Sequence, residues 1–194
     1  MELILIRHGL PEKVIRDDGA PADPPLSEEG LTQADKVAAW LQHEKIDSLY
    51  SSPMKRAYQT AEPIAAIKQL DIEVEPAVAE YDRDADHYIP VEQLKEVDYE
   101  RWKKLMSGEP DIDFDQFAET VCEGLSRIVA ANPGRRVAVT CHGGVVNVWA
   151  AHVLGFTPRM FFNPNYTSIS RFMIASTGER SVITLNEHHH IKVR

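Results

Sequence analysis

Two histidine–glycine pairs carry the side chains of this sequence that are best suited to chemistry. His8-Gly9 follows Arg7 and the apolar run Leu3–Ile6, and a second pair opens the motif His142-Gly143-Gly144 after another apolar run. Short runs of this type predict strands that are buried on both faces. In open α/β sheets, ligands bind beyond the carboxyl ends of the strands. If the two strands are neighbours, both imidazoles face one crevice, and the glycines let the backbone approach a ligand closely.

The helix expected after His142 favours an anion in that crevice. Its first turn offers backbone N–H groups and the positive end of the helix dipole. A histidine that follows a strand is more often a structural residue than a catalyst, so the pattern by itself leaves both interpretations open. Arg56 is similar, because an arginine in a first helical turn is ordinarily solvated, although an anion beside it would relieve its conflict with the helix dipole.

The elements that must position these residues alternate between strands and helices along the chain. Strands are predicted over 3–6, 46–50, 72–74 and 136–140, and a hairpin is predicted from 167–175 and 181–186. Helices are predicted after the cap Ser27, after the cap Ser52 with a kink or restart at Pro63, and over 91–106, 114–131 and 145–154. This order predicts a three-layer α/β/α fold, with a mostly parallel central sheet and helices on both faces.

Composition limits the classes of function. The chain has 194 residues, of which 43% are apolar and 26% charged, and a formal net charge of −9. This is typical of one globular domain, and the negative charge argues against a binder of nucleic acids or anionic membranes. Cys122 and Cys141 are too few for a disulfide scaffold and are predicted to be reduced thiols. With no apolar stretch near ~18 residues and no basic segment before the N-terminal run, a cytoplasmic protein is expected.

Four sequence blocks together point to a known family. They are LILIRHG at 3–9, DPPLSEEGLTQA at 23–34, SSPMKRAYQTA at 51–61 and VAVTCHGG at 137–144. In content, order and spacing these blocks resemble the histidine phosphatase superfamily, also called phosphoglycerate mutase-like. One block alone would be weak evidence, whereas the four together are highly specific. The resemblance implies the phosphoglycerate mutase-like version of the three-layer fold.

The resemblance also implies a division of labour among the residues of these blocks. His8 is the nucleophile and becomes a phosphohistidine, and Arg7, Arg56 and His142 hold the phosphoryl group, with Gly143 at the substrate. Chemistry is consistent with these roles, because imidazole has a reference pKa of about 6.5 and its neutral form can attack phosphorus. Guanidinium groups offset the phosphoryl charge and hold its oxygens in bidentate geometry.

The acid that protonates the leaving oxygen is best matched by Glu80. Asp82, Asp84 and Asp86 crowd the same loop, so a neighbouring aspartate as the acid, or a merely solvated acidic loop, stays open. The segment after Glu80 lacks the Gly-x-Trp-Glu-Gly pattern of many phosphatases in the family, and residues 10–12 lack their Glu-Thr. The lid that faces the substrate is therefore expected to be atypical.

Other candidate features receive structural interpretations. The aspartates at 82, 84 and 86 lack the glycine and glutamate of a calcium loop. The run His188–His190 is interpreted as structural or surface, and Cys141 as a core thiol. Four aromatic residues are predicted to lie in the core rather than to form a ligand platform: Trp40, Trp149, Phe161 and Phe162.

Together these observations predict a metal-independent phosphatase without a cofactor, which transfers a phosphoryl group from a monoester to His8 and then to water. Residues 1–194 are expected to form one domain, with 76–132 as a helical insertion or lid over the site. The expected partner is a small phosphorylated metabolite or a phosphoprotein, and oligomeric state is not predicted. Three alternatives remain: a phosphomutase, which in this family is usually longer, a protein phosphohistidine phosphatase, and a non-catalytic module that binds phosphorylated ligands.

Overall fold

A central sheet of six strands organises the computed structural model, which describes residues 1–107 and 113–192. The strand order is β4 (Ile72–Val74), β3 (Ser48–Ser51), β6 (Arg136–Cys141), β1 (Glu2–Arg7), β7 (Ile169–Ile174), β8 (Arg180–Glu187). The first four run parallel to one another, and β7 is antiparallel to both β1 and β8. The predicted mostly parallel sheet is confirmed, and the two strands that precede His8 and His142 are neighbours in it.

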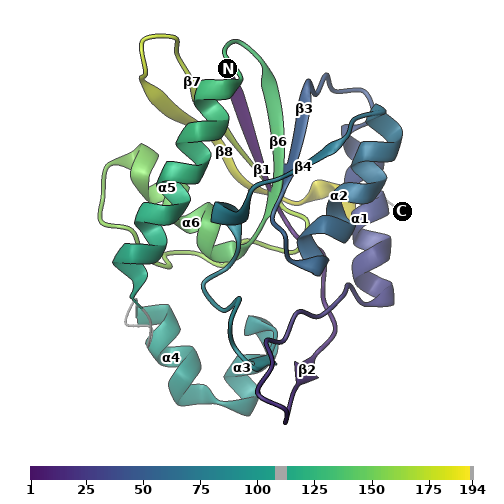
Figure 1. Cartoon of the computed structure of the whole chain (residues 1–194), viewed down its shortest axis with the longest axis vertical. Coiled ribbons are helices and arrows are strands. Elements are labelled where there is room, and N and C mark those ends of the chain that lie inside the picture. The colour runs from purple at the N-terminus through teal and green to yellow at the C-terminus, as the bar shows by residue number, and fades with distance from the viewer. Residues whose placement is uncertain (108–112, 193–194) are drawn as a thin grey trace.

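Helices cover both faces of this sheet (Figure 1). One face carries α1 (Glu28–Leu41) and α2 (Lys55–Lys68), and the other carries α5 (Phe114–Ala131) and α6 (Gly143–Leu154). The three-layer prediction is therefore confirmed. A short 3₁₀ helix, η1 (Pro76–Val78), follows β4, and α7 (His189–Lys192) follows β8 and packs beside α1.

A smaller group of elements lies below the sheet in Figure 1, on the side of the carboxyl ends of β1 and β6. It comprises α3 (Val91–Val97), α4 (Tyr99–Ser107), β2 (Val14–Ile15) and β5 (His87–Tyr88), and the two short strands pair antiparallel. A satellite apolar cluster that includes Leu94, Met160 and Trp102 packs these helices onto the rest of the chain.

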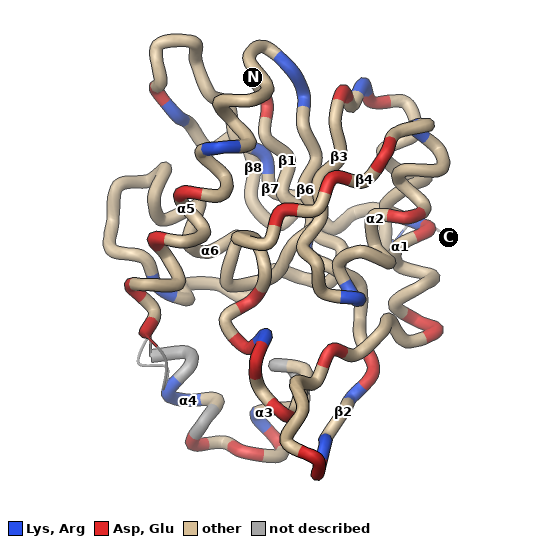
Figure 2. Tube along the Cα trace, in the orientation of Figure 1, with Lys and Arg blue, Asp and Glu red and all other residues tan. Residues whose placement is uncertain are grey.

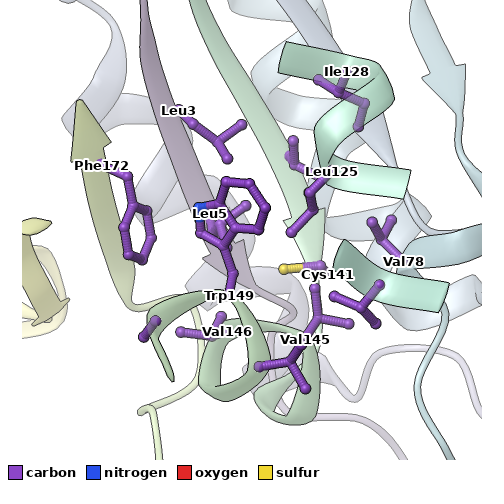
Figure 3. Close-up of a cluster of buried hydrophobic side chains, with 14 of the residues drawn as sticks. Leu3, Leu5, Val78, Leu125, Ile128, Cys141, Val145, Val146, Trp149 and Phe172 are labelled. Atoms are coloured by element: carbon purple, nitrogen blue, oxygen red, sulfur yellow. The ribbon is translucent and has the colours of Figure 1, made fainter. Parts of the chain in front are cut away.

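Alternation along β1 explains why helices lie on both faces. Leu3 and Leu5 point into one core and Ile4 and Ile6 into the other, and all four side chains are fully buried. The core on the side of α5 and α6 is the larger and includes Trp149, which Figure 3 shows among apolar side chains from β1, β6, α5 and α6. A strand flanked in this way must be apolar at every position.

Helix boundaries differ from the sequence prediction in three places. The helix after Ser52 begins at Lys55 and runs through Pro63 without a restart, because Ala57, Ala61 and Ile64 keep one buried stripe on the sheet. The predicted helix over 91–106 is two helices separated at Asp98, and α6 begins at Gly143 rather than 145. The segment 108–112, between the predicted helices over 91–106 and 114–131, lies outside the described residues.

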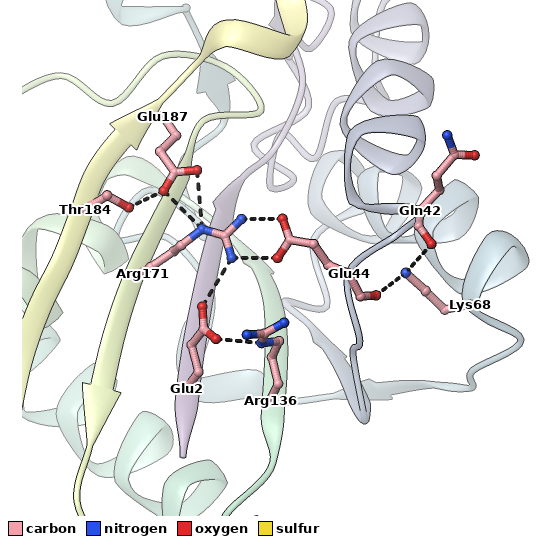
Figure 4. A network of polar contacts seen from close by, with 8 residues as sticks. All are labelled: Glu2, Gln42, Glu44, Lys68, Arg136, Arg171, Thr184 and Glu187. Carbon is pink, nitrogen blue, oxygen red and sulfur yellow. Dashed lines mark hydrogen bonds and ion pairs between the residues drawn. The ribbon is translucent and has the colours of Figure 1, made fainter.

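Arg171 forms the centre of a polar network that ties distant parts of the sheet together (Figure 4). Its guanidinium donates to both carboxylate oxygens of Glu44, at 2.7 and 2.8 Å, to Glu187 at 3.0 Å and to Glu2 at 3.2 Å. The Arg171 side chain is only 11% exposed. One side chain thereby joins β1, β7, the end of β8 and the turn after α1.

Charge is distributed rather than concentrated. In Figure 2, Lys and Arg positions are scattered among the more numerous Asp and Glu positions, and several acidic positions lie in the smaller group of elements below the sheet. Within residues 1–107 and 113–192, no helix combines the length and the apolar character needed to cross a membrane.

Candidate active site

The carboxyl ends of four adjacent parallel strands deliver the predicted site residues to one place. His8 directly follows β1, and its backbone N–H donates to the Cys141 carbonyl at 2.9 Å, which fixes it beside the end of β6. His142 follows β6. β3 leads through Ser52 into α2, whose first turn carries Arg56, and β4 leads through η1 to Glu80.

His8 and His142 lie against each other, with ring centroids 5.1 Å apart and planes inclined by 58°. Both side chains are buried, His8 at 2% and His142 at 0% exposure. Nδ1 of His8 lies 2.7 Å from the Gly9 carbonyl oxygen, which can only accept. The ring proton therefore resides on Nδ1, and Nε2 keeps its lone pair, toward which Arg56 Nε donates at 3.3 Å.

Electrostatics keep both imidazoles neutral. Burial, followed by the charges of Arg56 and Arg7, holds the pKa of His8 well below its ordinary value. Burial and then Arg56 hold the pKa of His142 well below its ordinary value in the same way. A neutral imidazole whose other nitrogen is held as a donor is a competent nucleophile.

Arg7 is aimed by a loop far along the chain. Its Nη1 donates to Asn163 Oδ1 at 3.3 Å and to the Pro164 carbonyl, and its guanidinium lies 4.0 Å above the ring of Tyr166. Asn147, in α6, holds that loop: its Oδ1 accepts from the backbone N–H groups of residues 161 and 162, and its Nδ2 donates to the carbonyl of residue 162. These contacts fix the Arg7 guanidinium, and the residue is only 3% exposed.

Arg56 is fully buried, contrary to the usual solvated position of an arginine in a first helical turn. Besides the contact with His8, its Nη2 donates to Asp82 Oδ1 at 3.0 Å, and its guanidinium lies 4.5 Å from the Tyr88 ring centroid. Its Nη1 is buried without a hydrogen-bond partner among the described residues. Buried donors of this kind are rare unless an anion or water pairs with them.

One ring nitrogen of His142 is likewise without a partner among the described residues. Its Nε2 lies 2.8 Å from the Ser52 hydroxyl, while Nδ1 is buried and finds no partner in the described part of the chain. Gly143, predicted to lie at the substrate, occupies the first turn of α6, and a Cβ atom built on it would lie 3.8 Å from Arg7 Nε. The backbone therefore passes directly beside the arginine.

Glu80 lies against the opening turn of α6, with 8% exposure. Gly144 N–H donates to its Oε2 at 2.9 Å, and Tyr81 N–H donates to its Oε1 at 3.2 Å. Burial, reinforced by the charge of Asp82, raises its pKa to about 7 despite these hydrogen bonds. A carboxyl group with this pKa can give up and regain a proton near neutral pH.

The loop acids separate into different environments. Asp82 pairs with Arg56, Asp86 lies 2.7 Å from His87, and Asp84 is 84% exposed at its side chain. Glu80 also borders a cavity of about 460 Å³ whose lining includes Tyr81, Phe117 and Thr120. Glu80 is buried at 8% exposure and its pKa is raised, which favours it as the acid.

Several residues at the site were not predicted from the sequence to have a functional role. Ser52, predicted as a helix cap, instead contacts His142, and its hydroxyl accepts from the Met54 N–H at 3.2 Å. Tyr88 and Tyr166 supply ring faces to the two arginines. Ser52 stands in the quoted block at 51–61, so a small polar residue just past a strand could have indicated it.

Within residues 1–107 and 113–192, no group of three His, Cys, Asp or Glu side chains is arranged to hold a metal ion. In the histidine run, His190 is 3% exposed and its Nε2 lies 3.0 Å from the Thr167 hydroxyl. Metal independence itself remains a prediction.

Comparisons with known proteins agree with this geometry. Over 107 residues the chain is 40% identical to phosphoserine phosphatase 1 of Hydrogenobacter thermophilus, in an alignment that covers 53% of this chain and 50% of that protein. It thus spans about half the length of that relative. It is 29% identical over 155 residues to phosphoglycerate mutase-like protein 4 of Arabidopsis thaliana, covering 75% of this chain and 67% of the relative.

A solved structure shares the whole fold. The phosphoserine phosphatase of Entamoeba histolytica, solved in complex with 3-phosphoglyceric acid, superposes with a TM-score of 0.78 at 24% identity and 98% coverage of both chains. The model of branch 1 of the histidine phosphatase superfamily matches residues 3–187. The chain belongs to the histidine phosphatase superfamily, branch 1.

Proposed function

We propose that this protein is a phosphatase that hydrolyses a phosphate monoester through a phosphohistidine on His8. The observation that carries the proposal is a pair of buried nitrogens beside that ring, Nη1 of Arg56 and Nδ1 of His142, which have no partner among the described residues. A phosphoryl oxygen would accept from Nη1 of Arg56, and from Nδ1 of His142 in the tautomer that carries its proton there while Nε2 accepts from the Ser52 hydroxyl. A phosphoryl group would also explain why two arginines and two neutral imidazoles are buried together.

In the first step, Nε2 of His8 attacks phosphorus while the bond from phosphorus to the ester oxygen breaks. Glu80 gives its proton to that departing oxygen, so the alcohol leaves neutral and Glu80 becomes a carboxylate. The Gly9 carbonyl accepts the hydrogen bond from Nδ1–H of His8 throughout and stabilises the positive charge that develops on the ring.

In the second step, water attacks phosphorus and the bond from phosphorus to Nε2 breaks. The Glu80 carboxylate takes the proton from the water, which restores the starting protonation state. Arg7, Arg56 and His142 act in both steps by holding the phosphoryl oxygens and offsetting their charge. Gly143 lets the backbone lie close to the bound group.

The remaining elements of the proposal concern coverage, substrate and location. Residues 1–194 act as one domain, in which the segment 76–132 covers the site. The substrate is a small phosphorylated metabolite, supported by relatives whose names and titles specify phosphoserine and 3-phosphoglyceric acid. A reducing, cytoplasmic location is supported by the two free cysteines, Cys122 and the fully buried Cys141.

The test is to trap the intermediate. After rapid acid-free quenching, wild-type protein mixed with radiolabelled monoester is expected to carry alkali-stable, acid-labile label, as a phosphoramidate does. His8→Ala is expected to carry none and to release no p-nitrophenol from p-nitrophenyl phosphate. His43→Ala, at an exposed histidine, is the matched control and should behave as wild type. Activity that survives EDTA would support metal independence.

Each alternative predicts a different outcome. A phosphomutase would return the label to a second hydroxyl of the substrate rather than to water. A protein phosphohistidine phosphatase would prefer a phosphorylated protein to small esters, and a binding module would bind phosphate without any label on His8. Label retained in His8→Ala would overturn the proposed intermediate.

A further inference from the structure

Asp82 makes a contact that the proposed chemistry does not require. Its Oδ1 accepts from Nη2 of Arg56 at 3.0 Å, and Arg56 is the same guanidinium whose Nε faces His8. The Asp82 side chain is 19% exposed and that of Arg56 is 1% exposed, so water screens the pair only in part. The Asp82 carboxylate therefore contacts the Arg56 guanidinium, which is proposed to hold the phosphoryl oxygens.

The three nitrogen atoms of the Arg56 guanidinium face three different environments. Nε is directed at His8, Nη2 at Asp82, and Nη1 is buried without a partner among the described residues. Guanidinium binds carboxylates and phosphoryl groups with the same N–H geometry. A phosphoryl group that uses Arg56 must therefore lie beside the Asp82 carboxylate or displace it, and either arrangement opposes its binding.

The other acids of the loop do not make this contact. Asp84 is 84% exposed and lies 3.7 Å from Arg83, and Asp86 is directed to His87. The loop itself is a turn, in which Glu80 and Asp82 carbonyls accept from the N–H groups of residues 83 and 85. Of the three aspartates in this turn, Asp82 is the one that contacts Arg56, whereas Asp84 and Asp86 contact other residues.

We propose that Asp82 is a specificity-determining residue whose carboxylate competes with phosphoryl anions for Arg56, weakening the binding of phosphate and of esters with further negative charge. The inference rests on the proposed function, because it assigns a role within the same site. Its benefit to a phosphatase is faster departure of the inorganic phosphate that would otherwise remain on two buried arginines and two imidazoles.

Calorimetric titration with inorganic phosphate tests this without requiring turnover. Asp82→Asn keeps the size of the side chain and removes its charge, and it is expected to bind phosphate about tenfold more tightly than wild type at low salt. Asp84→Asn removes the same charge two residues away and is expected to bind within about twofold of wild type. Added salt should narrow the difference between Asp82→Asn and wild type.

Kinetics provide the second measurement. With p-nitrophenyl phosphate as substrate, Asp82→Asn should be inhibited by inorganic phosphate at about one tenth of the concentration that inhibits wild type. Asp82→Ala, which also removes the charge, guards against an effect specific to the amide and should show the same direction. A gain in affinity is a result that damage to the fold does not produce.

The outcomes separate the two ideas. If phosphate binds wild type and Asp82→Asn equally, or binds the variant more weakly, the inference fails while the proposed function stands. If Asp82→Asn loses turnover by about a thousandfold with unchanged phosphate affinity, Asp82 is the acid and the inference is wrong. If phosphate binds none of the proteins, the proposed function and the inference both fail.

Discussion

Gly143 and Gly144 stand next to each other in the first turn of α6, but the space beside them differs. A Cβ atom on Gly144 would lie 2.2 Å from Oε1 of Glu80 and 3.1 Å from its Cδ. On Gly143 the nearest atoms, from Arg7 and Pro164, would lie 3.8 Å away, which is ordinary van der Waals contact. The same added methyl group is therefore excluded at one position and accommodated at the next.

Gly144→Ala is expected to destabilise the fold and to displace the acid. Glu80 must retreat by about 1 Å to make a normal contact, which breaks the hydrogen bond between its Oε2 and the N–H of residue 144. Overpacking costs about 1–3 kcal/mol, and the replacement of a helical glycine returns up to about 1 kcal/mol. The net loss of up to about 2 kcal/mol corresponds to a fall in Tm of up to about 8 °C at this chain length.

Thermal unfolding of the two alanine variants measures this difference, with Gly143→Ala as the matched control. Gly143→Ala should melt at the wild-type temperature or slightly above it, because it gains helix propensity without a clash. Turnover of p-nitrophenyl phosphate by Gly144→Ala should fall about tenfold to hundredfold, since acid catalysis is impaired. The reasoning is refuted if Gly144→Ala melts with Gly143→Ala and turns over like wild type.

Three further predictions concern the proton on Glu80, the ion pairs of Arg171 and the loop held by Asn147. Because Glu80 has a pKa of about 7, kcat/KM should decline about tenfold per pH unit above that value, and Glu80→Gln should lack this limb in a pH–rate profile. The Glu80 carboxyl group keeps its proton in the folded chain and releases it near pH 4.5 in the unfolded chain. The free energy of unfolding of wild type should therefore fall by up to about 3 kcal/mol between pH 4.5 and 7, relative to that of Glu80→Gln, as measured by urea unfolding. Arg171→Met leaves three partly buried carboxylates without their shared partner and should lower the free energy of unfolding by about 3–5 kcal/mol, with Arg171→Lys intermediate; equal urea midpoints would contradict this. Asn147→Ala should lower the free energy of unfolding by about 2 kcal/mol. It should also weaken phosphate binding in calorimetry, because the loop that positions Arg7 loses its support. Unchanged phosphate affinity would contradict the proposed link between this loop and Arg7.

The architecture was largely predictable because its signals are local. Buried parallel strands require continuous apolar runs, and Leu3–Ile6 and the run before His142 have this property. Aromatic positions were less predictable. Trp149 is fully buried as predicted, but Trp40 is 45% exposed and packs on His190, and Phe161 is 36% exposed. Size and apolarity alone do not show which face of an element a ring occupies.

The meeting of the site residues was predictable, whereas their partners were not. The rule that ligands lie at the carboxyl ends of strands predicts that His8 and His142 face one crevice if their strands are neighbours. The contact between Asp82 and Arg56 depends on how a turn between η1 and β5 is oriented, and residues 10–12 and 79–90 carry no periodicity that fixes such an orientation. Asn147 acts through a loop 14 residues away, which no local pattern encodes.

The position of β1 at the centre of the sheet has a consequence for biosynthesis. Its apolar side chains pair with β6, whose register partner of Glu2 is Arg136, and with β7, where Glu2 lies opposite Met173. A ribosome adding about 5–20 residues per second therefore exposes this strand for many seconds before either neighbour emerges. This apolar strand therefore stays unpaired until more than two thirds of the polypeptide has been made, and unpaired strands of this kind are prone to aggregation.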